Sequence, residues 1–404
     1  MKFIFTLLSA LILTGCAVVP QWNSELPYQP SQAPQVGDIL HLETGHYVSE
    51  KQMLANTGFY PLVYVGEVHD NPASHTLQLK VLKAMVKRRP GKVALGMEMF
   101  TAEQQVALDK WVAGELDERA FLKESRMYSE GWGHYYELYR ELLEYCRDNQ
   151  IPIVGLNVDK KLARTVAMTP LTKLELRDRE RIPEMDMQDR YQRTMIQEIF
   201  GAHIKSNTML ESFYRRQTLW DETMAQSVAD YMKSNMGMRM LVIAGGWHIE
   251  YGFGIPRRVH RRLPIPYLTI GGETLTIPVE KQGQMMDVDM PEFPMPPVDY
   301  LAFQEYEIFK KKGVSLGVLI DDSEAGKGVK VTGVIPGSTA DKAGIKKGNY
   351  LLRLDGERLN ESFDLVYAVK QKSEGDKAAL VVKDEQGERT VAVTFISVKK
   401  RHGK

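Results

Sequence analysis

The sequence predicts an α/β fold in which a largely parallel sheet is flanked by helices, followed by a small β-rich domain. Apolar runs alternate with helix-like segments up to about residue 280, then a Pro- and Met-rich stretch gives way to short strands punctuated by glycine. Strands that alternate with helices build parallel sheets, because each crossover returns the chain to the same edge. A chain of 404 residues also exceeds what one hydrophobic core usually organises.

The strand candidates of the first domain are five apolar runs. They cover residues 62–67, 93–99, 151–157, 240–245 and 267–270. After the first run, Asn71 suits a helix N-cap and Pro72 the first helical turn, and Pro90 ends the helix. Long amphipathic helices are expected between 159 and 236. The first domain therefore spans 37–280, and residues 281–312 are a Pro/Met-rich linker.

The first sixteen residues are typical of an export signal. Lys2 precedes an apolar run from Phe3 to Leu13 that is too short to span a membrane. The tetrapeptide Leu13-Thr14-Gly15-Cys16 resembles the bacterial lipobox, which implies a signal peptide over 1–16 and acylation of Cys16, with palmitate among the acyl chains. Ala17 resembles the residue found in lipoproteins destined for the outer membrane. Residues 17–36 would be a flexible tether, so the chain is expected to be lipid-anchored at the outer membrane, on its periplasmic or surface side.

Composition excludes one class of partner and constrains the thiol chemistry. With 52 basic and 52 acidic residues the chain has no net field that would attract nucleic acid. The two cysteines are Cys16, which the lipobox reserves for lipid, and Cys146, which lies in a helix-like stretch. We therefore expect no internal disulfide and a buried, structural thiol at Cys146.

Four polar residues stand at or just beyond the ends of predicted strands. They are Glu67 and His69 after 62–65, Glu98 within 93–99, and His248 after 240–244. Open α/β sheets bind ligands outside the carboxyl ends of their parallel strands, so these four side chains are expected to form one site. The alternative is that each is a separate core polar group bonded to backbone.

Two chemistries fit these four residues. Two imidazoles and two carboxylates suit a divalent metal such as zinc, manganese or iron. A hydroxide bound to that metal would act as the nucleophile of a metal-dependent hydrolase, such as an esterase or a peptidase. Without a metal, His69 would act as general base and Glu67 would orient it. The Glu-x-His spacing lacks the partner at helical spacing that the His-Glu-x-x-His zinc motif has, which counts against the metal.

Residues 313–398 resemble a PDZ domain of the bacterial type. The resemblance rests on Leu316-Gly317-Val318, the run from Val334 to Ile345, Gly348 and Asp355-Gly356. It implies a groove that accepts an extended peptide as an extra strand, with N–H groups near Leu316, Gly317 and Val318 holding a terminal carboxylate. Val366, on a helix expected near 362–372, would line that groove. A domain that keeps this fold and only packs against its neighbour is the alternative.

The first domain resembles the ChaN family of haem-binding lipoproteins, within the larger group that includes Tiki and TraB proteins and erythromycin esterases. The motifs that carry the resemblance are Gly66-Glu67-Val68-His69-Asp70-Asn71-Pro72, Met97-Glu98-Met99-Phe100, Glu130-Gly131-Trp132-Gly133-His134, Gly155-Leu156-Asn157, the run from Gln217 to Ala225, Ala244-Gly245-Gly246-Trp247-His248 and Gly252-Phe253-Gly254-Ile255-Pro256. The chain departs from the family pattern at Val68 and at Ser74-His75.

This resemblance implies a protein that holds haem for iron uptake, with a Tyr phenolate on the iron, and with two copies of the chain pairing as a homodimer. The residues expected to bind haem are an aromatic group at Tyr128, Trp132, His134 and Tyr135, with Tyr135 as the predicted iron ligand. The lipobox and this resemblance together predict a lipid-anchored, haem-binding protein of iron acquisition. The hydrolase is the first alternative, and an inert platform whose PDZ domain recruits a partner is the second.

Overall fold

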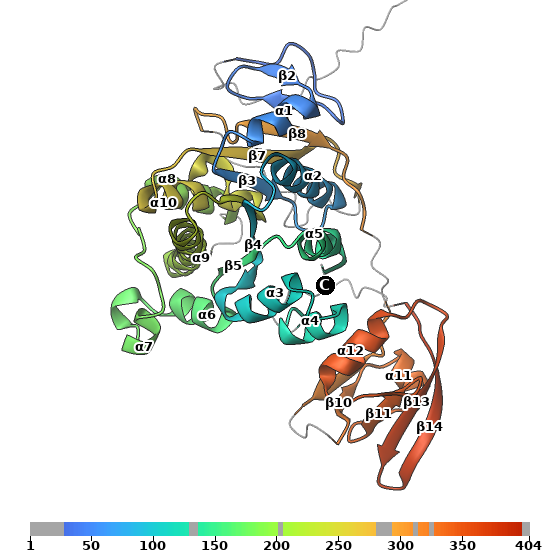
Figure 1. Cartoon of the computed structure of the whole chain (residues 1–404). Helices are drawn as coiled ribbons and strands as arrows, with labels where there is room; N and C mark the ends of the chain where they lie inside the picture. The colour runs from blue at the N-terminus through green and yellow to red at the C-terminus, as the bar shows by residue number, and fades with distance from the viewer. Residues whose placement is uncertain are drawn as a thin grey trace, which may run out of the picture. The chain divides into compact units, whose positions relative to one another are not determined.

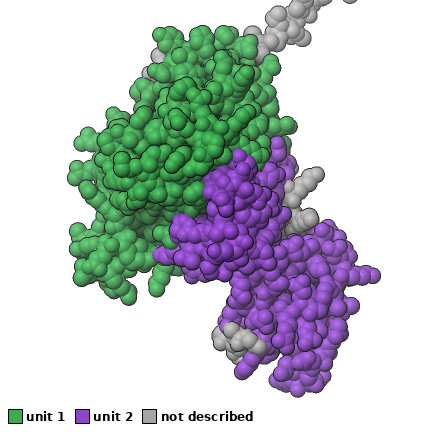
Figure 2. Space-filling model, in the orientation of Figure 1, with its two compact units in different colours: residues 1–69, 73–102, 152–306 green, residues 70–72, 103–151, 307–404 purple. Residues whose placement is uncertain are grey.

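The computed structural model describes residues 28–128, 136–200, 205–279, 293–309, 314–322 and 327–397. The chain forms two compact units, which Figure 2 shows in green and purple. Unit 1 comprises residues 1–69, 73–102 and 152–306, and unit 2 comprises residues 70–72, 103–151 and 307–404. No helix in the described ranges is both long enough and apolar enough to cross a bilayer.

Unit 1 is built on an eight-stranded sheet with the order β2-β1-β8-β7-β3-β6-β4-β5. The strands from β8 to β5 run parallel, whereas β1 pairs antiparallel with β2 and β8. The bounds are β1 Ile39–His41, β2 His46–Val48, β3 Leu62–Glu67, β4 Val93–Thr101, β5 Ile153–Asn157, β6 Arg239–Gly245, β7 Tyr267–Thr274 and β8 Tyr300–Gln304. The predicted parallel α/β sheet is confirmed.

The helices of this part of the chain alternate with the strands as the sequence predicts. In Figure 1, α9 and α10 lie on one side of the sheet and α2 lies on the other. The bounds are α1 Glu50–Thr57, α2 Pro72–Arg88, α6 Lys160–Met168, α7 Leu176–Arg179, α8 Arg190–Phe200, α9 Asn207–Ser234 and α10 Ile255–Arg262, with short 3₁₀ helices η1 Ala102–Gln104, η2 Leu171–Lys173, η4 Gly246–His248 and η5 Glu250–Gly252.

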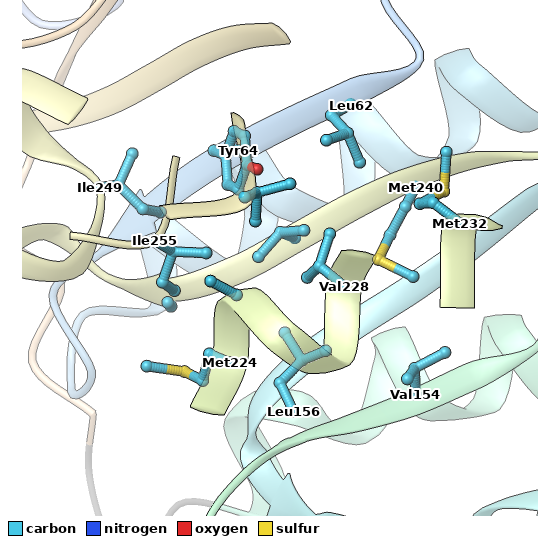
Figure 3. Close-up of a cluster of buried hydrophobic side chains, with 14 of the residues drawn as sticks. Leu62, Tyr64, Val154, Leu156, Met224, Val228, Met232, Met240, Ile249 and Ile255 are labelled. Carbon is cyan, nitrogen blue, oxygen red and sulfur yellow. The ribbon is translucent and has the colours of Figure 1, made fainter. Parts of the chain in front are cut away.

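The main core of unit 1 lies between one face of the sheet and helices α9 and α10. Alternate strand residues such as Leu62, Tyr64 and Leu156 are buried against Met224 and Val228 of α9, as Figure 3 shows. This alternation follows from the two-residue period of a strand, which sends successive side chains to opposite faces. Fully burying one such apolar side chain contributes roughly 1.5–3 kcal/mol. The core thereby fixes the register of the strands that carry the functional residues.

One strand lies where the sequence indicates a linker. Residues 281–312 were assigned to that linker, yet Tyr300–Gln304 form β8, which pairs with β7 and with β1. Ala302 is directly opposite Ile39. The strand was missed because it follows a run of prolines and has only five residues, whose buried side chains lie on both faces.

Unit 2 contains a helical part and an antiparallel sheet. The sheet has the order β14-β13-β11-β10-β9, with β12 paired to β11, and its core includes Leu316, Val329 and Leu380. The bounds are α3 Gln105–Val112, α4 Glu118–Glu124, α5 Tyr136–Asp148, β9 Val318–Asp321, β10 Val329–Val334, α11 Thr339–Lys342, β11 Tyr350–Leu354, β12 Glu357–Arg358, α12 Ser362–Lys370, β13 Lys377–Asp384 and β14 Gly387–Thr394. This sheet confirms the predicted β-rich second fold.

Candidate functional site

The structure brings the four predicted strand-end residues of unit 1 together. Glu67 ends β3, His69 follows it, Glu98 lies in β4 and His248 follows β6. Strands β3, β6 and β4 are adjacent in the sheet and parallel, so their carboxyl ends meet at one edge. The Glu67, Glu98 and His248 side chains are buried, and that of His69 is 28% exposed.

Glu67 and His69 form the first imidazole–carboxylate pair. The Nδ1 atom of His69 lies 2.6 Å from Oε1 of Glu67, and the Gln78 amide of α2 donates to the other Glu67 oxygen. Burial by itself would lower the pKa of His69, but the hydrogen bond to Glu67 and the charges of Glu67 and Glu98 raise it. His75 lies next to this pair, with Nδ1 3.7 Å from Glu67.

His248 forms the second pair, between two carboxylates. Its Nδ1 atom lies 2.5 Å from Asp221 of α9, and its Nε2 atom lies 3.4 Å from Glu98. Burial alone would lower the pKa of His248, but Glu98 and Asp221 raise it to about 10. In the same way, burial alone would raise the pKa of Glu98, but His248 lowers it to about 2. His248 is therefore a buried imidazolium at neutral pH.

A cavity of about 140 Å³ opens beside these pairs. It is lined by residues 66–69, residues 245–250, Gly271, Gly272 and Val298. Pockets that enclose a drug-sized ligand measure roughly 300–1,000 Å³, so this cavity admits a small group and cannot enclose a macrocycle. Glu250 also lines it, and burial, together with the nearby Glu273, raises the pKa of Glu250 to about 7.

The metal interpretation of Glu67, His69, Glu98 and His248 gains no support. Within the described residues, no group of three or more His, Cys, Asp or Glu side chains is arranged to hold a metal ion. The carboxylates instead pair with the imidazoles and with Gly245, whose N–H donates to Glu98 over 2.8 Å. The described side chains of this site are thus joined in imidazole–carboxylate pairs.

Sequence reasoning missed three residues of this site: Asp221, Gln78 and Glu250. Asp221 belongs to a motif from Gln217 to Ala225 that was noted without a role. A signal was present, because Gln217 and Asp221 are four residues apart and share one helix face, and both contact Nδ1 of His248. Glu250 follows His248 by two residues at the same strand end.

An aromatic cluster lies beside the cavity. It consists of Tyr251, Phe253 and Phe293 with Met195 and Ile199 of α8, and the Tyr191 ring of α8 contacts Phe253 and Phe293. The Tyr191 and Phe253 rings stack with centroids 5.3 Å apart, and Phe293 meets Phe253 edge-on at 5.0 Å. Trp247, which lines the cavity, packs on the same cluster. Tyr251, Phe253 and Phe293 are buried and only Tyr191 is exposed, so the cluster is a packed aromatic core at the edge of unit 1.

Of the four residues predicted to bind haem, the structure describes one, Tyr128. Trp132, His134 and Tyr135 lie outside the described residues, as does Cys16. Tyr128 stacks on Phe363 of α12 at 5.9 Å, and the Lys370 ammonium lies 4.6 Å from the centre of its ring. Burial raises the pKa of the Tyr128 phenol. Tyr128 therefore contacts α12, and its part in haem binding stays a prediction.

Ion pairs also connect helix α4 with the C-terminal part of unit 2. Arg119 of α4 donates to Asp364 of α12 over 2.9 Å and contacts Glu357, and Lys123 pairs with Glu361. Asp364 is buried, so it depends on Arg119 for a countercharge. Helix α12 is thus fixed on one side by α4 and Tyr128.

The residues predicted to form the peptide groove lie at β9 and on α12. Leu316 is buried, Gly317 has φ +79°, and Val318 begins β9, which among the described strands pairs only with β10. A Cβ atom at Gly317 would lie 2.2 Å from the Ser338 side chain, so only glycine fits there. Val366 is half-buried on α12. Strand β9 is thus the last strand in the described order of this sheet, and peptide addition beside it stays a prediction.

The chain matches two family models and several known proteins. A model described as haem-binding uptake, Tiki superfamily, ChaN matches residues 53–259, and a PDZ domain model matches residues 314–395. Protein RETICULATA-RELATED 5, chloroplastic, of Arabidopsis thaliana is 24% identical over 221 residues, which cover 50% of this chain and 30% of that protein. Serine protease PepD of Mycobacterium tuberculosis is 36% identical over 87 residues, which cover 21% of this chain and 19% of that protein.

The matched segments span less than a third of either curated relative. A solved structure described as cofacial heme binding to ChaN of Campylobacter jejuni is 15% identical with a TM-score of 0.49, and the match covers 65% of this chain and 95% of that one. Residues 314–395 form a PDZ domain.

Proposed function

We propose that this chain, which belongs to the ChaN family of haem-binding uptake proteins in the Tiki superfamily, binds haem through its N-terminal domain. The observation that carries the proposal is the match of residues 53–259 to a family model described as haem-binding uptake, Tiki superfamily, ChaN. The strand-end cavity is too small to enclose the ligand, so the haem would lie outside it.

When bound, haem would supply a ferric iron, and a tyrosinate ligand would favour that oxidation state. The chain's own contribution is to hold a flat apolar ring and to provide the phenol. A homodimer in which two copies cover each other's bound haem is part of this proposal, because a ring held on an open surface leaves one face exposed to water.

The test is an absorbance titration of the full chain lacking residues 1–16 with ferric haem. We expect a saturable Soret change and a charge-transfer band of the high-spin tyrosinate type. A titration that stays featureless and does not saturate would contradict the proposal. Sedimentation of the loaded protein measures whether two chains pair.

We also propose that the protein is a lipoprotein of the outer membrane that takes part in haem or iron uptake. The support is the tetrapeptide Leu13-Thr14-Gly15-Cys16, followed by Ala17. Radioactive palmitate should label the wild type but not Cys16→Ser. The Cys16→Ser variant should also be absent from the outer-membrane fraction. Labelling that persists in Cys16→Ser would contradict the anchor.

For the PDZ domain we propose peptide binding, with the peptide added beside β9 and its carboxylate near Leu316, Gly317 and Val318. The free edge of β9 supports this proposal. A library of C-terminal peptides should select binders to the full chain, and Gly317→Val, which places a branched side chain against Ser338, should abolish their binding. Unchanged binding by Gly317→Val would contradict this groove.

The two imidazole–carboxylate pairs favour a second candidate function, an acid–base hydrolase. His69 is the partly exposed imidazole of the cavity, and Glu67 orients it, which is the arrangement of a general base. The His248 imidazolium would stabilise an anion formed in the cavity. A panel of esters and peptides tests this with wild type and His69→Gln. Turnover lost in His69→Gln would support the hydrolase, and turnover retained in a Glu67→Ala, His248→Ala double variant would exclude these residues.

A further inference from the structure

Two histidines face each other in the hairpin that β1 and β2 form at the edge of the unit 1 sheet (Figure 1). His41 of β1 lies directly opposite His46 of β2 in this antiparallel pair. Residues directly opposite project to the same face, with their Cβ atoms roughly 4.5–5.5 Å apart. His46 is exposed and His41 is half-buried. The two imidazoles are therefore close enough for one nitrogen of each to reach the same ion.

Hydrogen bonding orients the His41 ring and sets its tautomer. Its Nδ1 atom lies 2.9 Å from the Thr44 hydroxyl oxygen, and that hydroxyl donates to the His41 carbonyl over 3.4 Å. Thr44 Oγ1 therefore accepts from Nδ1–H, which leaves the electron pair of the neutral imidazole on Nε2. Tyr300 also packs on the His41 ring, with centroids 4.8 Å apart. A ring whose other nitrogen is hydrogen-bonded in this way is typical of a metal-ligating histidine.

The charged groups at this corner of the sheet are acidic. Glu43 lies in the turn between the two histidines, and Asp299 directly precedes β8. Burial raises the pKa of Tyr60, and the charge of Asp299, the Tyr300 phenol and the charge of Glu43 raise it further. Both carboxylates thus act on the surroundings of Tyr300, whose ring contacts His41. Negative charge beside two neutral imidazoles favours a cation over an anion.

We propose that His41 and His46 together bind one divalent transition-metal ion, and that they bind Cu²⁺ more tightly than Ni²⁺ or Zn²⁺. Imidazole nitrogens suit all three ions, and Cu²⁺ has the highest affinity for a given nitrogen site. Each histidine donates one nitrogen. Water completes the coordination, because no third His, Cys, Asp or Glu among the described residues joins them in a metal-binding group. The site is separate from the strand-end cavity, whose lining includes neither histidine.

The test is a calorimetric titration of Cu²⁺ into the full chain lacking residues 1–16, as wild type, His46→Gln and His260→Gln. His260 is the matched control because it is exposed like His46 and lies on helix α10 instead of in a strand pair. We expect His46→Gln to lose at least about tenfold in affinity at the tightest copper site, and His260→Gln to bind as the wild type does. His46→Gln should fold, since the side chain is exposed, and its thermal midpoint in a chelating buffer checks this.

A second variant separates the orientation of His41 from ligation. Thr44→Val removes the hydroxyl that accepts from Nδ1 and keeps both imidazoles, so it should weaken Cu²⁺ binding by about tenfold or more. The electron paramagnetic resonance spectrum of bound Cu²⁺ should show two nitrogen ligands in wild type and in Thr44→Val, and one in His46→Gln. The inference is overturned if His46→Gln binds Cu²⁺ with the affinity and spectrum of the wild type, or if His260→Gln weakens binding as much as His46→Gln does.

Discussion

Replacing His248 with glutamine should reveal the buried imidazolium as a pH-dependent loss of stability. The pKa of His248 rises from its ordinary 6.5 to about 10 in the fold. At about 1.36 kcal/mol per unit, this rise corresponds to roughly 5 kcal/mol, and removing one partner of a buried ion pair typically costs about 3–5 kcal/mol. We therefore expect His248→Gln to lower the free energy of unfolding by about 3–5 kcal/mol at pH 6.

The direction of the pH dependence follows from the protonation state of His248 that the folded protein favours, which is the imidazolium. Because the folded-state pKa is raised, the stabilisation is complete below pH 6.5 and is lost as the pH rises to about 10. Urea denaturation of wild type and variant at pH 6, 8 and 10 measures this difference, which should shrink towards pH 10. His46→Gln is the control, since His46 is exposed on β2, and should stay within about 0.5 kcal/mol of wild type. A difference that is absent at pH 6, or constant up to pH 10, would refute the buried imidazolium.

Three further predictions concern other parts of the fold. The Cys146 thiol is buried and its pKa is raised, so a thiol reagent should label it in denaturant and leave it unlabelled in the native protein; rapid native labelling would contradict its burial. A double-mutant cycle of Arg119→Ala and Asp364→Ala, measured by urea denaturation, should give a coupling free energy of about 0.5–1 kcal/mol. If the losses of stability in the two single variants simply add up in the double variant, the ion pair does not contribute to stability. Gly155→Ala places a Cβ 2.4 Å from the Thr101 carbonyl oxygen and should cost about 1–3 kcal/mol; an unchanged urea midpoint would show that β4 can move aside.

The sequence was sufficient to predict the parallel sheet, because its strands are continuous apolar runs with helices between them. It also predicted that Asn71 and Pro72 begin a helix that ends before Pro90, and α2 runs from Pro72 to Arg88. Strand β8 was missed because nothing in five residues after a proline run distinguishes a strand from a linker. Its pairing with β1 depends on residues about 260 positions away, which no local pattern contains.

For the site, the strand-end rule placed Glu67, His69, Glu98 and His248 at one edge of the sheet, and they do meet there. Asp221 could not be assigned in the same way, because it reaches His248 from the middle of a long helix. The aromatic cluster was not predicted for a similar reason. Tyr191 and Phe253 look like ordinary apolar positions until the fold places α8 against the loop after His248.

The pairing of β1 with β8 determines how unit 1 would respond to a mechanical load. The chain enters the sheet at Ile39 and leaves it at Gln304, and Ile39 lies opposite Ala302, so the entry and exit points are at the same end of an antiparallel pair. A pull between residues 36 and 305 therefore acts across the hydrogen bonds of this pair and separates them one at a time, as in a zipper, instead of shearing them together. The central strands that carry Glu67, Glu98 and His248 lie outside this path, so tension at the two ends would detach β1 before it disturbed the site.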